Sequence, residues 1–334
     1  MTFSNCAAAR IPVRTSLASL VLLALAFAPR QADAETKYPS KPVRIVVPFA
    51  PGGVADITAR VVADRLGGKL GGRFYIENLP GAGGIAAARA VISSPPDGHT
   101  LAMLTNGTAV SVSLFDNLPF DPVKDFAAIS SLGFFDFVFA TNADSQFKTL
   151  ADFIAAARAK PGSLNVGTIN IGSTQNLSAE LFKTAAGIDF QIIPYRGTPE
   201  LLVSTMQGNV ALMIDSYSSM KGNIAENKLR ALASSGSLRS ETTPDIPTLR
   251  EAGVADYDVV SWNALFAPAG TPPEIVKALN GALQEILAEP DVKKRLLELG
   301  IEAKAGAPEE ISARLKSDID KWRSVIEKAG IQKQ

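Results

Sequence analysis

Residues 43–60 read VRIVVPFAPGGVADITAR and join a β-branched run, a turn and a periodic apolar pattern. The run Val43 to Val47 is typical of a strand inside a parallel sheet. Pro48 and Pro51 lack backbone donors and end this strand, while the following glycines allow the positive φ angles of a tight turn. The apolar residues then recur with helical spacing, at Ile57, Val61, Val62 and Leu66. The stretch therefore predicts a strand, a turn and a helix, the repeating unit of an α/β fold.

The start of this predicted helix is a candidate anion site. Its first backbone N–H groups have no partner within the helix and lie at the positive end of the peptide dipoles, which favours a carboxylate or a phosphate. The candidate ligand-binding residues here are Phe49, Pro51, Gly52, Gly53 and Asp56. Taken alone, the pattern also fits a plain strand-to-helix turn without a ligand.

Strand-like and helical runs alternate along the rest of the chain, which predicts the α/β class. Strands are expected at residues 74–77, 101–104, 137–140, 164–167, 191–194, 211–214 and 230–233. Helices are expected at residues 84–93, 150–158, 175–186 and 198–207. An extended segment at 262–267 then precedes three helical segments, at 274–288, 290–299 and 308–329.

Two extended segments, residues 134–141 and 259–268, are the places where the chain is expected to cross between two lobes and return. The first lobe then comprises residues 35–137 with 262–334, and the second comprises residues 138–261. Ligands of open α/β sheets lie outside the carboxyl ends of the strands. The loops expected to meet at one cleft are therefore those after Val47, Leu104, Gly167, Pro194 and Ile214.

Residues 1–34 have the pattern of a cleavable signal peptide. Arg10 and Arg14 form a basic front, residues 17–28 form an apolar core, and Ala32-Asp33-Ala34 is a small-residue cleavage site. The apolar core is shorter than the ~20 residues of a membrane-spanning helix. We therefore expect cleavage near Ala34 and export of a soluble protein to the periplasm.

The composition argues against several classes of function. The chain has 33 basic and 33 acidic residues, and without the three arginines and one aspartate of the leader it has 30 and 32, a net charge of −2. A near-neutral chain without a basic run lacks the footprint that nucleic acids require, so no nucleic-acid partner is expected.

The residue composition also gives little support to a metal site or to hydrolase activity. Cys6 is the only cysteine and His99 the only histidine, which excludes Cys/His and multi-histidine zinc sites. A Ser-His-Asp triad would depend on His99 alone, and no Gly-x-Ser-x-Gly elbow is present. We expect no metal site, no cofactor and no catalytic residue.

The segment Gly81-Ala82-Gly83-Gly84-Ile85-Ala86 contains G-x-G-x-x-A between a strand and a helix, which superficially matches a dinucleotide fingerprint. We interpret these glycines as a helix start that packs closely on the sheet, because an exported protein meets little NAD. The same glycines could line the floor of the cleft.

Polar residues in several other loops lie where a ligand could reach them. One loop follows an apolar strand and contains Thr105, Asn106 and Thr108, and a second precedes a helix and contains Ser173, Thr174, Gln175 and Asn176. Hydroxyl and N–H groups in these loops could bind an anion or could form ordinary helix N-caps.

A third loop ends where a helix begins and consists of Tyr195, Arg196, Gly197 and Thr198. The guanidinium of Arg196 could bind a carboxylate through two hydrogen bonds, or it could join two loops through an internal salt bridge. Asp215 ends an apolar strand. Its carboxylate could orient Arg196 or a hydroxyl group, or it could accept a hydrogen bond from a ligand.

Five motifs resemble the Bug-type receptors of tripartite tricarboxylate transporters: residues 38–56 (YPSKPVRIVVPFAPGGVAD), 77–84 (ENLPGAGG), 96–101 (PDGHTL), 194–197 (PYRG) and 245–248 (DIPT). The resemblance covers essentially the whole mature chain, in order. It implies a type II periplasmic binding fold, in which two α/β lobes enclose a ligand. It also implies that a carboxylate is bound by backbone amides, hydroxyl groups and ordered waters of residues 49–56, 105–108, 172–176 and 195–198. Asn176 departs from the family pattern, because many relatives have histidine there.

The sequence therefore predicts a receptor that captures a small carboxylate in an interlobe cleft and delivers it to the membrane permease subunits of a tripartite transporter. The carboxylate could be a dicarboxylate, a tricarboxylate or an aromatic acid. Aromatic residues could form its wall, although core packing explains them equally well: Phe49, Phe134, Phe135, Tyr217 and Trp262. One alternative is a periplasmic enzyme that uses Asp56 or Asp215 as a base, and another is a ligand-dependent partner of a membrane sensor. A monomer is expected.

Overall fold

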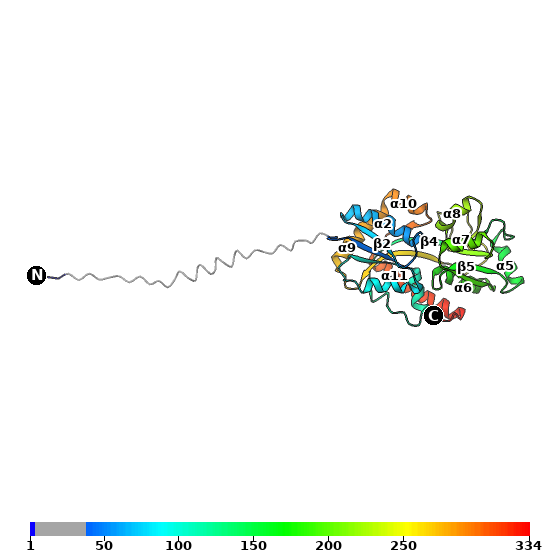
Figure 1. The fold of residues 1–334 in the computed structure, drawn as a ribbon, viewed down its shortest axis with the longest axis horizontal. Coiled ribbons are helices and arrows are strands. Elements are labelled where there is room, and N and C mark those ends of the chain that lie inside the picture. Colours follow the sequence, from blue (N-terminus) through cyan, green and yellow to red (C-terminus); the bar gives the residue numbers. More distant parts are fainter. Residues whose placement is uncertain (4–37) are drawn as a thin grey trace. The chain divides into compact units, whose positions relative to one another are not determined.

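The computed structural model describes residues 1–3 and 38–334. Apart from residues 1–3, the expected signal peptide therefore lies outside the described residues, as does its cleavage site. Residues 38–334 form a mixed α/β fold around a ten-stranded sheet (Figure 1). The strand order is β2-β1-β3-β9-β4-β7-β5-β6, and β8 and β10 both pair with β4.

The elements agree closely with the sequence pattern. In the first part of the chain they are β1 (Val43–Val47), α2 (Val54–Leu70), β2 (Phe74–Asn78), η2 (Ala82–Gly84), α3 (Ile85–Ile92), β3 (Thr100–Thr105), α4 (Asn106–Leu114) and β4 (Phe126–Asn142). The middle part contains α5 (Leu150–Ala159), β5 (Asn165–Ile169), α6 (Thr174–Ala186), β6 (Gln191–Tyr195), α7 (Thr198–Met206), β7 (Leu212–Ser216), α8 (Tyr217–Ala225) and β8 (Leu229–Ser234). The last part contains β9 (Val260–Pro268), α9 (Pro273–Ala288), α10 (Pro290–Leu297), β10 (Glu302–Ala303) and α11 (Pro308–Ala329).

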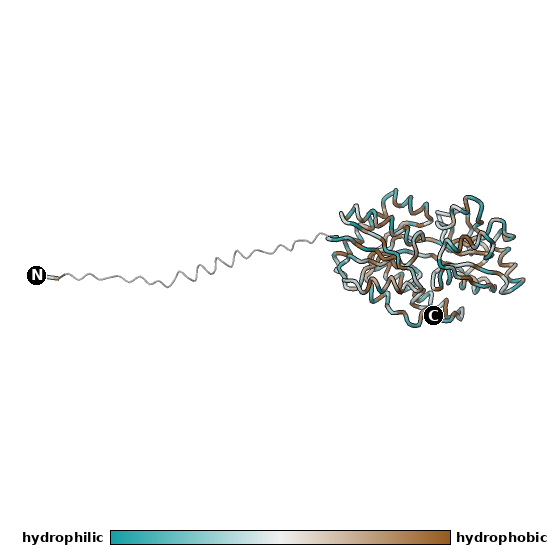
Figure 2. The backbone as a smooth tube through the Cα atoms, viewed as in Figure 1, coloured by the Kyte–Doolittle hydropathy of each residue, from teal (hydrophilic) through white to brown (hydrophobic). Residues whose placement is uncertain are grey.

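Strand β1 is buried on both faces, as its continuous apolar run predicts. It pairs in parallel with β2 and β3. Val43, Ile45 and Val47 pack in the core cluster that contains the apolar faces of α2 and α9, whereas Val46 packs in the cluster that contains α3 and α11. The alternation follows from the two-residue period of a strand, and Figure 2 shows the apolar segments gathered within the fold.

Strand β4 is much longer than the segment 137–140 that the sequence predicted. Its first part, up to Asp136, pairs with β9 and β10, and its second part, from Phe137, pairs with β7 and β8. Ser130, Ser131 and Gly133 interrupt the apolar pattern of the first part, where two β-bulges shift the register against β9. In Figure 1, β4 runs between the two groups of strands.

Helices α4 and α8 were not predicted as helices. The sequence of α4, NGTAVSVSL, is rich in β-branched and small polar residues, which have low helix propensity. Packing stabilises it instead, because the indole Nε1 of Trp322 on α11 donates to Asn106 Oδ1 at 2.6 Å. Tertiary contacts therefore override local preference here.

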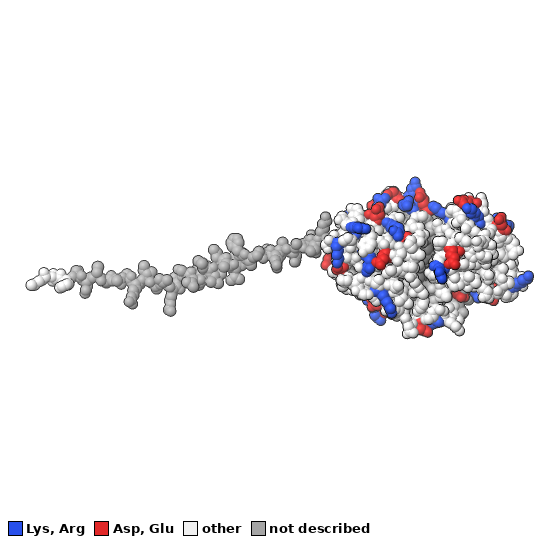
Figure 3. Space-filling model, viewed as in Figure 1, with Lys and Arg blue, Asp and Glu red and all other residues white. Residues whose placement is uncertain are grey.

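The surface shows no segregation of charge on the face drawn in Figure 3, where Lys and Arg alternate with Asp and Glu. Among the helices that the structure describes, none combines the length and the apolar character needed to cross a membrane. Over the same residues, no group of His, Cys, Asp and Glu side chains is arranged to hold a metal ion.

Candidate ligand-binding site

A cavity of about 320 Å³ lies at the carboxyl ends of the parallel strands. It is bounded by the loops that follow β1, β3, β5, β6 and β7, which are the loops that the sequence placed at one cleft. Phe135 and Phe137 of β4 and Ser261 and Asn263 of β9 complete its wall. This volume is sufficient for a small organic acid.

Many of the candidate residues line this cavity. Those that do are Phe49, Pro51, Gly52, Gly53, Thr105, Thr174, Gln175, Arg196, Gly197, Thr198 and Asp215. The structure places the other candidates outside its lining: Asp56, Asn106, Thr108, Ser173, Asn176 and Tyr195. Sequence reasoning did not select several residues of the wall: Phe137, Ile169, Asn170, Leu202, Ser216, Ser218, Ser219, Ser261 and Asn263.

Five helices, α2, α4, α6, α7 and α8, begin at the cavity. The first residues of α2, α7 and α8 receive no side-chain cap from Gly53, Gly197 or Ser216. Their first N–H groups therefore remain available to a ligand, and the helix dipoles add positive potential at the same place. By contrast, Ser173 caps α6, since its Oγ accepts from the N–H of Asn176 at 3.1 Å. The converging helix starts favour an anion in the cavity.

Arg196 supplies a positively charged side chain at the cavity wall, where its residue is exposed. Within residues 38–334 its guanidinium forms no ion pair with a carboxylate, so the internal salt bridge between loops is not present. Its backbone N–H donates to Glu200 Oε2 at 3.3 Å. The amide of Asn170 is best satisfied when its nitrogen donates to the carbonyls of Tyr195 and Arg196, each at 3.3 Å. These bonds fix the loop and leave the guanidinium available to a ligand.

Asp215 is a buried carboxylate, 2 % exposed, at the end of β7. It accepts hydrogen bonds from the hydroxyl of Thr198 at 2.6 Å, the N–H of Ser216 at 2.7 Å and the amide of Gln175 at 3.1 Å. Burial raises the pKa of Asp215 above its ordinary value, although these three hydrogen bonds act in the opposite direction. Asp215 therefore orients a hydroxyl group, one of the roles that the sequence allowed.

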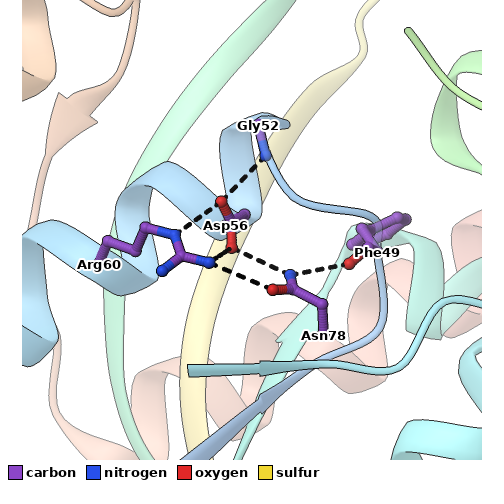
Figure 4. Close-up of polar contacts among 5 residues, drawn as sticks. All are labelled: Phe49, Gly52, Asp56, Arg60 and Asn78. Carbon is purple, nitrogen blue, oxygen red and sulfur yellow. Dashed lines mark hydrogen bonds and ion pairs between the residues drawn. The ribbon is translucent and has the colours of Figure 1, made fainter. Parts of the chain in front are cut away.

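Asp56 is 2 % exposed and does not line the cavity. Figure 4 shows its carboxylate between Gly52, Arg60 and Asn78. Arg60 donates to both of its oxygens at 2.9 Å, and Asn78 and the N–H of Gly52 each donate at 3.0 Å. Burial opposes ionisation, but these hydrogen bonds outweigh it and hold the pKa of Asp56 below its ordinary value. The carboxylate is thus fully engaged in fixing the turn.

Residues 58–331 match the family model described as Tripartite tricarboxylate transporter family receptor. The chain belongs to this family. Among solved structures it is similar to Rpa4515 of R. palustris with adipate (33 % identity, TM-score 0.85, 89 % of this chain and 100 % of that one). It is also similar to the periplasmic binding protein BugD, with 30 % identity, a TM-score of 0.82 and coverage of 89 % of this chain and 100 % of that one. A third similar structure is MatC of Rhodopseudomonas palustris with bound malate, with 34 % identity, a TM-score of 0.80 and coverage of 86 % of this chain and 100 % of that one.

This membership establishes the fold and the broad role of the chain. The receptor has the type II periplasmic binding fold of the Bug and tricarboxylate-receptor structures. Its family consists of solute-binding receptors and not of enzymes, and its relatives include periplasmic binding proteins.

Several candidate residues of the receptor stabilise its loops. Asn106 accepts from Trp322 at 2.6 Å and donates to Asp318 at 3.1 Å, so it joins α4 to α11. Asn176 donates to the hydroxyl of Thr168 at 3.3 Å. The other two bond locally, Thr108 to the N–H of Thr105 and Tyr195 to the hydroxyl of Ser204. The contacts of Asn106 with α11 depend on tertiary structure, so no sequence signal separates them from ligand contacts.

The glycine motif of residues 81–86 lines a smaller cavity of about 30 Å³ beside the first one. Gly81, Gly83 and Gly84 contribute to its wall, and Phe49 and Thr105 line both cavities. A space of this size holds about one or two water molecules and is far too small for a dinucleotide. The motif begins a helix next to the larger cavity.

Proposed function

We propose that the receptor binds a small carboxylate in the 320 Å³ cavity and delivers it, in the periplasm, to the membrane permease subunits of a tripartite transporter. The observation that carries the proposal is the convergence of five helix N-termini, three of them uncapped, on one cavity. The exposed guanidinium of Arg196 in its wall pairs with no carboxylate of residues 38–334. The adipate and malate complexes of Rpa4515 and MatC support a dicarboxylate. Phe49, Phe135 and Phe137 in the wall would also accommodate an aromatic acid.

Capture requires contacts from both sides of the cavity. Of the described residues, we assign 38–137 with 262–334 to one lobe and 138–261 to the other, joined where β4 and β9 pass between them. Gly53 of the first lobe and Arg196 of the second both line the cavity. A ligand that contacts both lobes binds the closed arrangement more tightly than the open one, and that difference in affinity drives closure.

The cavity is suited to binding rather than to catalysis. An enzyme of this kind would use Asp56 or Asp215 as its base. However, the Asp56 carboxylate lies outside the cavity lining and accepts hydrogen bonds from Arg60 and Asn78. Asp215 already accepts hydrogen bonds from three donors. Neither carboxylate is therefore placed to take a proton from a bound acid.

A thermal-shift screen tests the proposal. The protein is refolded from denaturant to remove any bound ligand and is heated with mono-, di- and tricarboxylates, aromatic acids and acidic amino acids. A ligand that binds only the folded state raises the melting temperature, and the rise increases with the ratio of its concentration to its dissociation constant. We expect a rise with at least one carboxylate. No rise with any member of the panel would contradict the proposal, and a product detected after incubation with a ligand would favour the enzyme.

A further inference from the structure

The turn of residues 49–53 supplies much of the cavity wall, and only its first residue, Phe49, packs against the core. Ala50, Pro51 and Gly52 are all exposed, and Gly52 adopts φ of +89°. An exposed turn of this composition samples many conformations unless other residues fix it. Ordering it during binding would reduce the affinity for a ligand.

Two residues outside the cavity hold both ends of this turn (Figure 4). At the first end, Asn78 of β2 donates to the carbonyl of Phe49 at 2.9 Å and, with the same amide nitrogen, to Asp56 Oδ1 at 3.0 Å. At the second end, the N–H of Gly52 donates to Asp56 Oδ2 at 3.0 Å. Asn78 and Asp56 thereby fix the separation of the two ends.

Arg60 completes the arrangement from the next turn of α2. Its Nε and Nη2 atoms donate to the two oxygens of Asp56 at 2.9 Å, and Nη2 also reaches Asn78 Oδ1 at 3.3 Å. A buried carboxylate without such a partner would be strongly destabilising. Arg60 therefore maintains the ionised form and the orientation of Asp56.

We propose that Arg60 and Asn78 are positioning residues that fix the turn of residues 49–53 and so determine how tightly the receptor binds any carboxylate. The inference rests on the proposed function and extends it to residues that do not line the cavity. Because Asp56 already accepts the N–H of Gly52, the amides that remain for the ligand are those of Gly53 and the start of α2. Their direction is set by the turn.

The test compares Arg60→Met and Asn78→Ala with the control Arg65→Met. Arg65 also lies on α2, and it forms ion pairs with Asp291 and Glu289 on the surface, away from the turn. Calorimetry measures the dissociation constants for adipate and malate, and hydrogen exchange of residues 49–53 is followed in the ligand-free protein. Exchange in β1 is followed at the same time to report global unfolding.

We expect Arg60→Met and Asn78→Ala to weaken the binding of both ligands by the same factor. That factor should be roughly tenfold, which corresponds to the net free energy of one lost hydrogen bond. Exchange of residues 49–53 should accelerate while that of β1 stays slow. Arg65→Met should change neither quantity. Arg60→Lys should restore part of the affinity, because an ammonium keeps the charge but not the paired geometry of the guanidinium.

Unchanged affinity in both variants would refute the positioning role. Weaker binding of only one of the two ligands would refute it as well. Unchanged exchange in residues 49–53 would refute it independently of any ligand. If the wild-type protein binds neither probe nor any other carboxylate, the proposed function fails, and the exchange experiment still decides whether Arg60 and Asn78 fix the turn.

Discussion

Asp56 and Arg196 show how burial and hydrogen-bond partners decide the role of a charged residue. Both were candidates for ligand binding from their positions next to helix starts. In the structure Asp56 is buried and bonded to four donor atoms, whereas the Arg196 side chain is exposed at the cavity without a carboxylate partner among residues 38–334. Arg60 follows Asp56 by four residues, and side chains at this spacing meet on one face of a helix. The sequence alone could therefore have suggested the ion pair between Asp56 and Arg60.

Replacing Arg196 with glutamine should weaken carboxylate binding by roughly tenfold or more, because a charge-assisted hydrogen bond contributes more than a neutral one. Arg196→Lys should retain part of the affinity, since it keeps the charge but loses the two parallel donors. Isothermal calorimetry measures both variants, and the exposed position predicts an unchanged melting temperature without ligand. Equal affinity of wild type and Arg196→Gln would exclude this residue from the site.

The hydroxyl of Thr198 donates to the buried carboxylate of Asp215 at 2.6 Å. Thr198→Val keeps the shape of the side chain but removes this donor, and should lower the free energy of unfolding by about 1–3 kcal/mol. Thr205→Val on the same helix is the control, because the Thr205 hydroxyl donates only to the carbonyl of Leu201. Urea denaturation should show a clearly smaller loss for the control. Equal losses of unfolding free energy would mean that the hydrogen bond from Thr198 to Asp215 stabilises the protein no more than the bond from Thr205 to a backbone carbonyl.

At the scale of whole elements, the sequence predicts best where local preference and tertiary packing agree. β1 is a β-branched run and α2 has apolar residues at helical spacing, and both were located correctly. The first part of β4 was missed because its serines and Gly133 interrupt the apolar alternation, and α4 was missed because contacts with α11 stabilise it. The positions of the cavity loops could be predicted, whereas the contacts of Asn78 with Asp56 and of Trp322 with Asn106 could not, because only the fold brings those residues together.

Alanine substitutions of two glycines, one in the turn before α2 and one within α2, should have opposite effects on stability. Gly52 has φ of +89°, so Gly52→Ala should destabilise the protein by about 1–2 kcal/mol through backbone strain. Gly68 lies within α2, and a Cβ there would meet no atom within 4 Å. Gly68→Ala should therefore stabilise the protein by about 0.5–1 kcal/mol through helix propensity. Urea denaturation compares the two variants. A Gly52→Ala protein as stable as wild type would show that the turn relaxes without cost.

At the scale of the whole molecule, Asp136 lies where β4 exchanges its β9 partner for β7. Burial, with added repulsion from Asp258 and Glu302, raises the pKa of Asp136 to about 7. The folded protein therefore holds this proton more tightly than the unfolded chain does. The resulting stabilisation is complete below the ordinary pKa of an aspartate and is lost as the pH rises to about 7.

Asp136→Asn removes this ionisation, so the variant should gain stability over wild type as the pH is raised from 5 to 8. Urea denaturation at several pH values measures the difference in unfolding free energy. Asp144→Asn, in an exposed turn, is the control and should keep the wild-type pH dependence. A difference between Asp136→Asn and wild type that is independent of pH would show that Asp136 has an ordinary pKa.

The proposed lobes can be tested directly, because residues 35–334 contain no cysteine and, in protein produced without residues 1–34, dyes will react only with introduced thiols. Asp64→Cys on α2 and Val203→Cys on α7 provide exposed positions on opposite sides of the cavity. If a carboxylate drives closure, energy transfer between the dyes should change on saturation with the ligand, with a midpoint at its calorimetric dissociation constant. A pair within the first lobe, Asp64→Cys with Lys277→Cys, should not respond. Confirmed binding without any change in the first pair would mean that the cavity is preformed and that β4 and β9 do not act as a hinge.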